Sequence, residues 1–450
     1  TIIDNTYDAQ VFKDIYNVCQ EDKNSINRRT SLISVGAIRG GSNTGNGGGI
    51  YAAANSTLNI YSGMIDGNFA KNGGAIFVDT GSKFNMYGGI IFNNETTGYA
   101  PGVYVTNNST FKMYDGIIIS NTGQNFGGGI HVSGLADKLS YFVMHNGIIA
   151  HNYSMYGAGV SLCEYSESII YNAEICYNYA LGNSAGLLAW NYTSKVDLYN
   201  CKINNNIAYF SSGVNGGAGI LSNGELNIHG GEICDNTYIN SYDTRVVNGG
   251  GVYISAGSAL FESVVVARNQ IKSFINDGEH AFAGGISIAS AASENVVFGA
   301  DVQVYDNIAH GINSDIRLEK GQKINITAVG RNTYLGIKLA DDYGSESFTN
   351  GYGANNGDDN PSEFFFSNDG VKIAILNGGE VSFENTIESN TYDFVYFEND
   401  VRKNYADNNL IHAVNDYEKS KTLNGGKLIL GNILPNTSVN EFITKVNYSG

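Results

Sequence analysis

Apolar and polar residues alternate along most of the chain in short runs, and the runs return in the same order. The block TLNIYSGMIDGN at 57–68 is repeated as KFNMYGGIIFNN at 83–94. Each block contains an alternating run, a bend of small residues, a β-branched residue and a closing Asn. Alternation with a period of two predicts strands that bury one face, so the chain is predicted to consist of repeated short strands.

The repeat is followed most clearly from its closing Asn, which returns at intervals of 26 to 38 residues. The closing positions are Gly41 (a degenerate first copy), Asn68, Asn94, Asn121, Asn152, Asn178, Asn206, Asn236, Asn269 and Asn307. Three residues earlier every copy carries Ile or Val: Ile38, Ile65, Ile91, Ile118, Ile149, Ile175, Ile203, Ile233, Val266 and Val304. We expect the closing Asn to occupy a left-handed turn, and its amide to bond from copy to copy.

A unit of three short strands cannot bury its apolar face alone, but stacked units can. The sequence therefore predicts an all-β fold, a right-handed parallel β-helix of about ten to twelve coils. Residues 1–30 are predicted to be an N-terminal cap helix over the first coil, because Val11, Ile15 and Val18 have helical spacing. Residues 31–330 are predicted to form the β-helix. Closing strands and a loop are expected at 331–385, and a linker with the start of a small module at 386–450.

Composition narrows the possible partners of the 450-residue chain. Its net charge of −17 and its 15% of charged residues leave no basic stripe for nucleic acid. No apolar run approaches the ~20 residues that span a bilayer, so we expect no membrane insertion. We expect a monomer.

The five cysteines contain no CxxC pair, so they give no zinc pattern. Cys176 and Cys234 share a column of the repeat but lie two coils apart, roughly 10 Å. That distance exceeds the ~7 Å that a disulfide allows between Cα atoms. We therefore expect free thiols.

The paired motifs GGA-I and [I/V]xxN resemble the GGA(I/L/V) and FxxN repeats of chlamydial polymorphic membrane proteins. The segment 313–385, with DIRLEKGQKINITAV and FTNGYGANNGDDNPSEFFFSNDG, is similar to the large adhesin-like β-helix surface proteins of Gram-positive gut anaerobes. In those proteins a dockerin or another attachment module often follows. The resemblance implies secretion and a place on the cell surface or in an extracellular complex.

An aromatic column lies seven residues before the closing Asn: Tyr61, Tyr87, Tyr114, His145, Tyr171, Tyr199 and His229. Its neighbours point inward, so we expect it to point outward. It could be a flat strip that stacks on sugar rings, or a ladder that stabilises neighbouring strands. A charge column of Glu174, Lys202 and Glu232 has carboxylates roughly 10 Å apart, near the spacing of an inverting glycosidase. Because Lys202 lies between them, we favour a ladder of ion pairs.

The corner after the closing Asn lengthens in three consecutive coils, at IAYFSSGVNG, TYINSYDTRVVN and QIKSFINDGEHAFA. These loops should stack into one lobe over 207–283. Insertions in solenoids collect on the binding face, although loops can also lengthen at little energetic cost. The candidate ligand residues in the lobe are Tyr209, Phe210, Tyr238, Tyr242, Arg245, Phe274, Asp277, Glu279 and His280.

Other chemistry is sparse in the sequence. A calcium site is conceivable in the polar loop with Asn355, Asn356, Asp358, Asp359 and Asn360, although a simple polar turn explains it as well. The NTD, GHG and RIK motifs typical of pectin-cleaving β-helix hydrolases are absent, and both DD pairs fall outside the coils. We therefore expect a protein that binds a glycan or a surface protein. A polysaccharide lyase or glycoside hydrolase with its site beside loops 207–283, and a structural spacer, are the alternatives.

Overall fold

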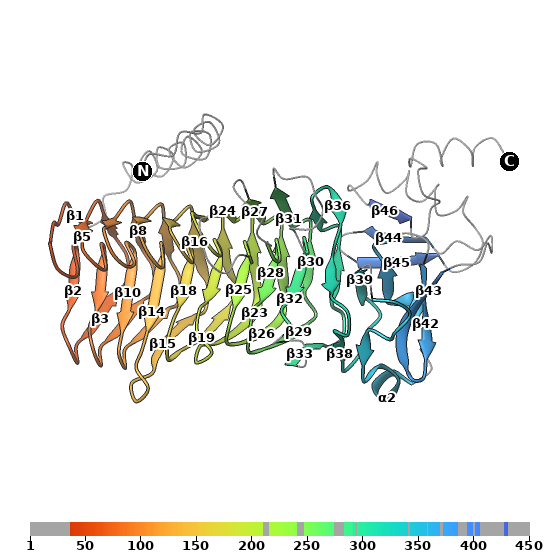
Figure 1. Ribbon diagram of the computed structural model, residues 1–450. Helices are drawn as coiled ribbons and strands as arrows, with labels where there is room; N and C mark the ends of the chain where they lie inside the picture. The colour runs from red at the N-terminus through yellow and green to blue at the C-terminus, as the bar shows by residue number, and fades with distance from the viewer. Residues whose placement is uncertain are drawn as a thin grey trace.

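The computed structural model is a rod of stacked coils in which almost all regular structure is strand (Figure 1). It describes residues 37–209, 216–240, 247–273, 283–290, 292, 295–340, 343–357, 359–369, 372–385, 394–398, 401–405 and 427–430. About 11 coils follow one another, which confirms the predicted parallel β-solenoid. The predicted N-terminal cap at 1–30 lies outside the described residues.

Each coil contributes strands to three long parallel stacks, which we call A, B and C. Stack A contains β2 (Ile50–Ala52), β6 (Ile76–Val78), β10 (Val103–Thr106), β14 (Ile130–Ser133), β18 (Val160–Leu162), β22 (Leu187–Ala189), β25 (Ile220–Ser222), β28 (Val252–Ile254), β32 (Ile286–Ile288) and β37 (Ile316–Leu318). Stack B contains β3 (Thr57–Ile60), β7 (Lys83–Met86), β11 (Thr110–Met113), β15 (Ser140–Met144), β19 (Ser166–Tyr171), β29 (Ser258–Glu262), β33 (Val296–Phe298), β38 (Ile324–Ile326) and β40 (Thr349–Asn350).

Stack C closes each coil before its corner. It contains β1 (Ala37–Arg39), β4 (Met64–Asp66), β8 (Ile90–Phe92), β12 (Ile117–Ile119), β16 (Gly147–Ala150), β20 (Ala173–Cys176), β30 (Val265–Ala267), β34 (Gln303–Tyr305) and β39 (Tyr334–Leu339). Two long strands, β23 (Lys195–Asn204) and β26 (Glu225–Cys234), run through both B and C.

A fourth, short stack D lies between C and the next A strand. It contains β5 (Phe69–Ala70), β9 (Glu95–Thr96), β13 (Thr122–Gly123), β17 (Tyr153–Ser154), β21 (Tyr179–Ala180), β24 (Ile207–Tyr209), β27 (Thr237–Asn240), β31 (Gln270–Ser273), β35 (Ile308–Ala309) and the antiparallel β36 (Ile312–Asn313).

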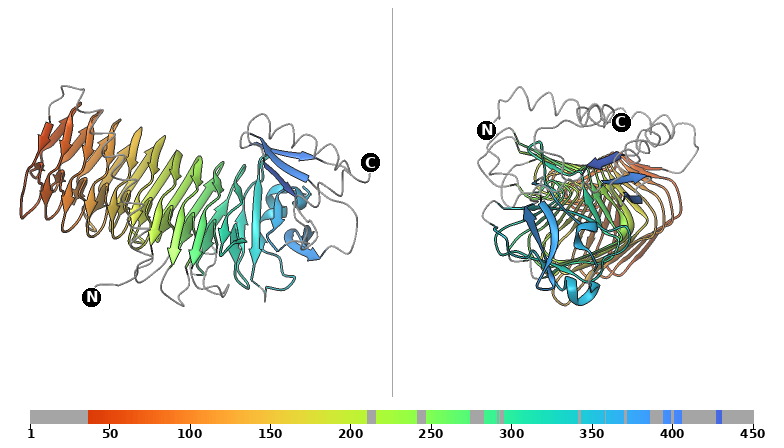
Figure 2. Two further views of the ribbon diagram at one scale, coloured as in Figure 1. Left: turned by 90° about the horizontal axis from the view of Figure 1, so that it is seen from above. Right: turned by 90° about the vertical axis from the view of Figure 1, so that its right-hand side faces the viewer.

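One continuous apolar core fills the rod, because like residues lie over like from coil to coil. Seen along the axis, the coils superpose around this core (Figure 2). Phe84 pairs with Phe111 in register, and their ring centroids are 4.5 Å apart. The Ile column is buried as predicted from Ile65 to Val304, and only its first member, Ile38, is 44% exposed at the end of the rod.

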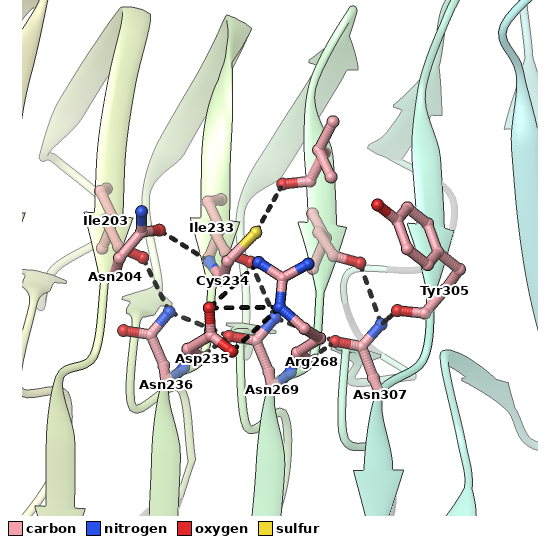
Figure 3. Close-up of polar contacts among 12 residues, drawn as sticks. Ile203, Asn204, Ile233, Cys234, Asp235, Asn236, Arg268, Asn269, Tyr305 and Asn307 are labelled. Atoms are coloured by element: carbon pink, nitrogen blue, oxygen red, sulfur yellow. Dashed lines mark hydrogen bonds and ion pairs between the residues drawn. The ribbon is translucent and has the colours of Figure 1, made fainter. Parts of the chain in front are cut away.

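The closing asparagines form a buried ladder of side-chain hydrogen bonds (Figure 3). The backbone N–H and the Nδ2 of Asn236 both donate to Oδ1 of Asn269, over 3.0 and 2.9 Å. The same Nδ2 also donates to the carbonyl oxygen of Ile203 over 2.7 Å. Equivalent bonds connect each asparagine from Asn68 to Asn307, so the predicted coil-to-coil bonding of amides is confirmed.

The left-handed turn lies one residue earlier than predicted. Positive φ angles of 51–57° occur at His151, Tyr177 and Arg268, each directly before a closing Asn. The prediction that the Asn itself adopts this conformation is wrong, because the Asn must extend its amide along the ladder. None of the described residues directly before a closing Asn is β-branched, as the steric cost of the left-handed region requires.

Parallel pairing continues beyond the predicted boundary at residue 330. Strand β39 pairs with β34 and β37, and β41 (Phe365–Ser367) pairs with β39. The short helix α2 (Tyr352–Asn356) and the 3₁₀ turn η2 (Pro361–Glu363) lie in this last turn. The hairpin of β42 (Lys372–Asn377) and β43 (Glu380–Asn385) follows, and then the antiparallel sheet of β44 (Phe394–Glu398), β45 (Val401–Tyr405) and β46 (Lys427–Leu430).

Four cysteines are free and buried, which confirms the expected thiols among the described residues. They are Cys163, Cys176, Cys201 and Cys234. Burial raises the pKa of Cys163 and of Cys234 to about 12, so both stay protonated at neutral pH. Cys19 lies outside the described residues.

Candidate ligand-binding surface

The predicted aromatic column is a continuous ladder of stacked rings on the outside of stack B. From Tyr61 to His229, neighbouring ring centroids are 4.8–5.8 Å apart and their planes differ by 1–16°. The interior rings therefore have their faces against their neighbours, and their edges point to solvent. A sugar stacks on an open ring face, so this arrangement favours the stabilising ladder over a flat sugar-binding strip.

A hydrogen bond extends the ladder at its C-terminal end. His229 and Glu262 are directly opposite each other in register, and Nδ1 of His229 lies 2.8 Å from Oε2 of Glu262. The carboxylate lies where the next ring would be. The column is thus made of contacts between neighbouring coils along its whole length.

The residues of the charge column also lie next to one another on consecutive strands. Lys202 pairs in register with Glu174 on one side and with Glu232 on the other. Its Nζ lies 3.5 Å from Oε1 of Glu232. Because a cation separates the two carboxylates, the arrangement supports an ion-pair ladder and not a pair of catalytic acids.

The three long loops leave one corner of consecutive coils, and most of their predicted ligand residues lie outside the described residues. Those residues are Phe210, Tyr242, Arg245, Phe274, Asp277, Glu279 and His280. The bases of the first two loops are paired through a bridge between Gly216 and Asn248. Tyr209 is half-buried at the end of β24. Tyr238 has no exposed surface and packs in the alanine-rich core of this corner, so its assignment to the ligand surface is wrong.

A second group of rings lies on the outside of stack A, beside the same corner. We call it the outer aromatic cluster; its members are Phe77, Tyr99, Tyr104, Phe126, His131, Tyr156 and Trp190. The central outward positions of β6, β10 and β14 supply Phe77, Tyr104 and His131, which pair in register. Tyr99, Phe126 and Tyr156 come from the corners before β10, β14 and β18, and Trp190 follows β22.

The rings of the outer aromatic cluster meet at many angles, unlike those of the ladder. Phe77 and Tyr104 are edge to face, with an angle of 83° between their planes. Phe126 contacts Tyr156 at 4.9 Å and 35°, and Trp190 at 6.0 Å and 64°. Tyr99, Tyr104, Phe126, Tyr156 and Trp190 are all half-buried. The cluster is therefore an irregular, partly exposed group of rings and not one continuous stack.

His131 lies at the centre of this cluster. Its ring centroid is 5.3 Å from that of Tyr99 and 4.9 Å from that of Tyr104. The side chain is 3% exposed, and its Nδ1 has no hydrogen-bond partner. Burial lowers the pKa of His131 to about 3, so the imidazole is neutral at physiological pH.

The outer aromatic cluster continues along stack A toward the long loops. Leu188, Leu221 and Tyr253 occupy the same outward column on the following coils, and Phe126, Tyr156 and Trp190 pack against them. The loop bases at Gly216 and Gly249 lie directly before β25 and β28. The aromatic column thus runs along stack A to the strands that follow the bases of the first two long loops.

Three of the seven cluster members belong to a column that is visible in the sequence. Tyr51, Phe77, Tyr104 and His131 each follow the aliphatic residue that opens a stack A strand. Four aromatic residues at one outward position in consecutive copies predict a ring column. Its partners Tyr99, Phe126 and Tyr156 lie in corners of changing length, so their alignment requires the structure.

Two asparagines of the polar loop considered for calcium accept hydrogen bonds from the chain itself. Oδ1 of Asn356 accepts from the backbone N–H of Val329, and Oδ1 of Asn360 accepts from Ser362. Asp359 is exposed, and Asp358 lies outside the described residues. Within the described ranges, no group of three or more His, Cys, Asp or Glu side chains could hold a metal ion.

A separate cavity of about 860 Å³ lies at the C-terminal end of the rod. Leu339, Tyr343 and Phe383 contribute apolar lining, and Asp369 and Lys372 contribute charge. Nζ of Lys372 is 3.9 Å from Oδ2 of Asp369, which also pairs with Lys338. Glu384 adds a second carboxylate to the lining.

The fold and this surface define a class: a parallel β-solenoid with an aromatic patch on one outer face. Comparison with protein families, with curated proteins and with solved structures finds no match to this chain. None of the helices in the described part of the chain is both long and apolar enough to cross a membrane.

Proposed function

We propose that this protein is an extracellular β-helix binding protein that recognises a glycan at the outer aromatic cluster. The observation that carries the proposal is the group of half-buried rings around His131, which do not stack into a ladder. Binding sites are typically lined by aromatic side chains with a few polar groups. The location outside the cell rests on the resemblance of the repeats and of 313–385 to adhesin-like surface proteins.

The electrostatics of the cluster support a neutral ligand. The chain as a whole carries a net charge of −17, but the seven cluster members are uncharged at neutral pH. Burial keeps His131 neutral and raises the pKa of Tyr104. A sugar presents apolar C–H faces to rings and hydroxyls to the phenol groups, so it matches this surface better than an ion does.

The same pKa shifts support binding over catalysis. General acid–base catalysis works best with a group whose pKa lies near the working pH. Burial moves the pKa values of both groups away from pH 7, downward for His131 and upward for Tyr104. A polysaccharide lyase or hydrolase at the loops over 207–283 remains the alternative, and the experiment below includes it.

Trp190 makes a direct test possible, because it is the single tryptophan of the chain. Its fluorescence reports on this cluster alone. Soluble plant and bacterial polysaccharide fragments are titrated into the protein, and a saturable change in emission is expected for the bound class. Tyr156→Ala should weaken that binding roughly five- to tenfold, the loss of one stacking contact of about 1–1.5 kcal/mol.

The matched control is Tyr87→Ala, which removes a ring of the ladder and should leave the glycan affinity unchanged. Product analysis for new reducing ends and for unsaturated sugars runs in parallel. A glycan that binds equally well to Tyr156→Ala would move the site away from the cluster. Cleavage products would identify an enzyme, and no binding across the panel would favour a spacer.

A further inference from the structure

Tyr192 has the most exposed large hydrophobic side chain among the described residues, at 78%. It lies in the corner between β22 and β23, two residues after Trp190 of the outer aromatic cluster. Its ring stacks on no other aromatic ring in the described part of the chain. At this exposure at least one face of the ring is open to solvent, which distinguishes Tyr192 from the half-buried rings of the cluster.

The turn that carries Tyr192 is held by hydrogen bonds. Oδ1 of Asn191 accepts from the backbone N–H and from Oγ1 of Thr193, each over 3.2 Å. The carbonyl oxygen of Asn191 accepts from the backbone N–H of Ser194 over 2.9 Å. Oγ1 of Thr193 also accepts from the backbone N–H of Tyr165, on the preceding coil, over 2.9 Å. The exposed ring therefore projects from a fixed turn, so a ligand that binds it pays little in lost backbone freedom.

Trp190 connects this corner with the rings at the opposite end of the stack A strands. The backbone of Trp190 directly follows β22, beside Tyr192. Its ring centroid, however, is 6.0 Å from that of Phe126 and 6.3 Å from that of Tyr156. Phe126 and Tyr156 lie in the corners that precede stack A strands, whereas Tyr192 lies in a corner that follows one. The rings thus extend across the width of stack A, and Tyr192 lies at the far edge.

We propose that Tyr192 is a further ring of the ligand surface, and that the ligand is a linear oligosaccharide that lies across the rod from Tyr156, over Trp190, to Tyr192. This inference rests on the proposed glycan site at the outer aromatic cluster. The C–H face of a sugar packs well on an open ring face, which Tyr192 supplies.

The length of the ligand follows from the span of these rings. Tyr156 and Trp190 have ring centroids 6.3 Å apart, and two residues of chain add up to about 7 Å between Trp190 and Tyr192. The three rings therefore cover roughly 13 Å. A disaccharide is shorter than this span, so at least three linked sugars are needed to contact all three rings.

A chain along the rod axis is the competing arrangement. Tyr99, Phe126 and Tyr156 lie at one corner of consecutive coils, so a ligand on these rings would run lengthwise and would not reach Tyr192. Tyr99 is already stacked on two neighbours, on Phe126 at 6.1 Å and on His131 at 5.3 Å. Tyr192 has no such neighbour, so its ring is the better platform and the crosswise arrangement is favoured.

The test is the dependence of affinity on the length of the ligand, measured by isothermal titration calorimetry. The probes are the disaccharides and hexasaccharides of β-1,4-linked glucose, xylose and mannose. Wild type should bind a hexasaccharide more tightly than the matching disaccharide. Tyr192→Ala should weaken hexasaccharide binding roughly five- to tenfold and leave disaccharide binding unchanged. Tyr192→Phe keeps the ring and should keep the affinity.

The matched control is Tyr61→Ala, which removes a ring that is 69% exposed at the end of the aromatic ladder. It should change neither affinity. Hexasaccharide binding that depends on Tyr156 but not on Tyr192 would overturn this inference and leave the glycan site in place. Equal losses of disaccharide and hexasaccharide affinity in Tyr192→Ala would also overturn it.

Two further outcomes separate the arrangements. Weakened binding in Tyr99→Ala, together with wild-type binding in Tyr192→Ala, would place the chain along the rod. Hexasaccharides that fail to bind, while larger polysaccharide fragments bind, would exclude a short linear chain as the ligand. Failure of every glycan to bind the wild type would overturn the proposed function itself.

Discussion

Asn307 is joined to Asp315 by two hydrogen bonds that converge on one carboxylate oxygen. Its backbone N–H and its Nδ2 each donate to Oδ1 of Asp315 over 2.8 Å. Asp315 thus takes the role that the next Asn plays in every earlier coil. Every Nδ2 in the ladder donates in the same direction, so the amide dipoles add and their positive end meets the carboxylate. This is the arrangement by which an acidic residue stabilises the N-terminus of a helix.

The free energy of unfolding should fall as the pH rises from about 4 to about 6 because of Asp315. Burial raises the pKa of this carboxyl from 3.8 to about 6. Between these values the folded protein keeps a proton that the unfolded chain has released, so stability decreases with pH. The full effect is roughly 3 kcal/mol. Asp315→Asn should flatten this part of the curve, as measured by thermal unfolding at several pH values.

The control for Asp315→Asn is a double variant that exchanges the acid and the amide between positions 315 and 368. Asn368 accepts from the backbone N–H of Asp315 and donates to its Oδ2, each over 2.8 Å. In Asp315→Asn two NH₂ groups face each other. The double variant Asp315→Asn/Asn368→Asp restores a donor opposite an acceptor and should recover stability at neutral pH. A pH profile unchanged from wild type in the single variant would show that Asp315 does not titrate here.

His131 should make the free energy of unfolding change with pH in the opposite direction to Asp315. Burial lowers its pKa from 6.5 to about 3, so below about pH 6.5 the unfolded chain binds a proton that the folded protein excludes. Stability is then lost as the pH falls, by up to roughly 4–5 kcal/mol at pH 3. His131→Phe should remove this loss, since Phe77 occupies the same outward column. A stability difference between the two proteins that stays constant from pH 7 to pH 4 would contradict the prediction.

Ile118 should be among the most sensitive positions of the rod. It has no exposed surface and belongs to the column of inward Ile residues. Ile118→Ala should lower the free energy of unfolding by roughly 2–5 kcal/mol, through lost burial and the cavity that remains. Ile117→Ala, on the outward side of the same strand, is the matched control and should cost clearly less in a denaturant titration. Equal losses at both positions would refute the register.

The aromatic ladder should contribute to stability and not to binding. Tyr114 stacks on Tyr87 at 4.8 Å and on His145 at 5.1 Å. Tyr114→Ala removes both contacts and should cost about 1–2 kcal/mol in thermal unfolding. Tyr192→Ala, at a ring that is 78% exposed, should change stability by less than about 0.5 kcal/mol. Loss of glycan affinity in Tyr114→Ala would make the ladder the ligand surface.

The repeat made the architecture predictable from sequence. The Ile column fixed which face of stack C points inward, and the closing Asn fixed where each coil turns. The left-handed conformation was assigned to the closing Asn, because Asn is common in such turns. It belongs to the preceding residue, because the closing Asn must extend its amide to hydrogen-bond along the ladder. Closing strands were predicted at 331–385, but not their parallel pairing with the coils. Lys338 stands where the closing Asn of β39 would be, and in β41 Phe365 replaces the Ile or Val three residues before Asn368.

Side-chain geometry was the part that the sequence could not supply. The outward direction of Tyr61 and Tyr87 followed from alternation, but alternation does not give the ring orientation. The spacing between coils is close to the distance at which rings stack, so in-register rings cover each other's faces. The outer aromatic cluster escaped prediction for another reason. Tyr99 and Phe126 lie in corners whose length varies, so no fixed interval relates them to Tyr104 and His131.

The asparagine ladder also determines how this rod would yield under mechanical load. The strands lie across the axis, so tension between the two ends of the chain would unfold the coils one at a time from an end of the rod. Each rupture breaks one rung and frees the residues between successive asparagines. That number is 26 between Asn68 and Asn94 and 38 between Asn269 and Asn307. The gains in chain length at successive unfolding steps of a single-molecule force trace are therefore unequal. Their order would reveal from which end the rod unfolds.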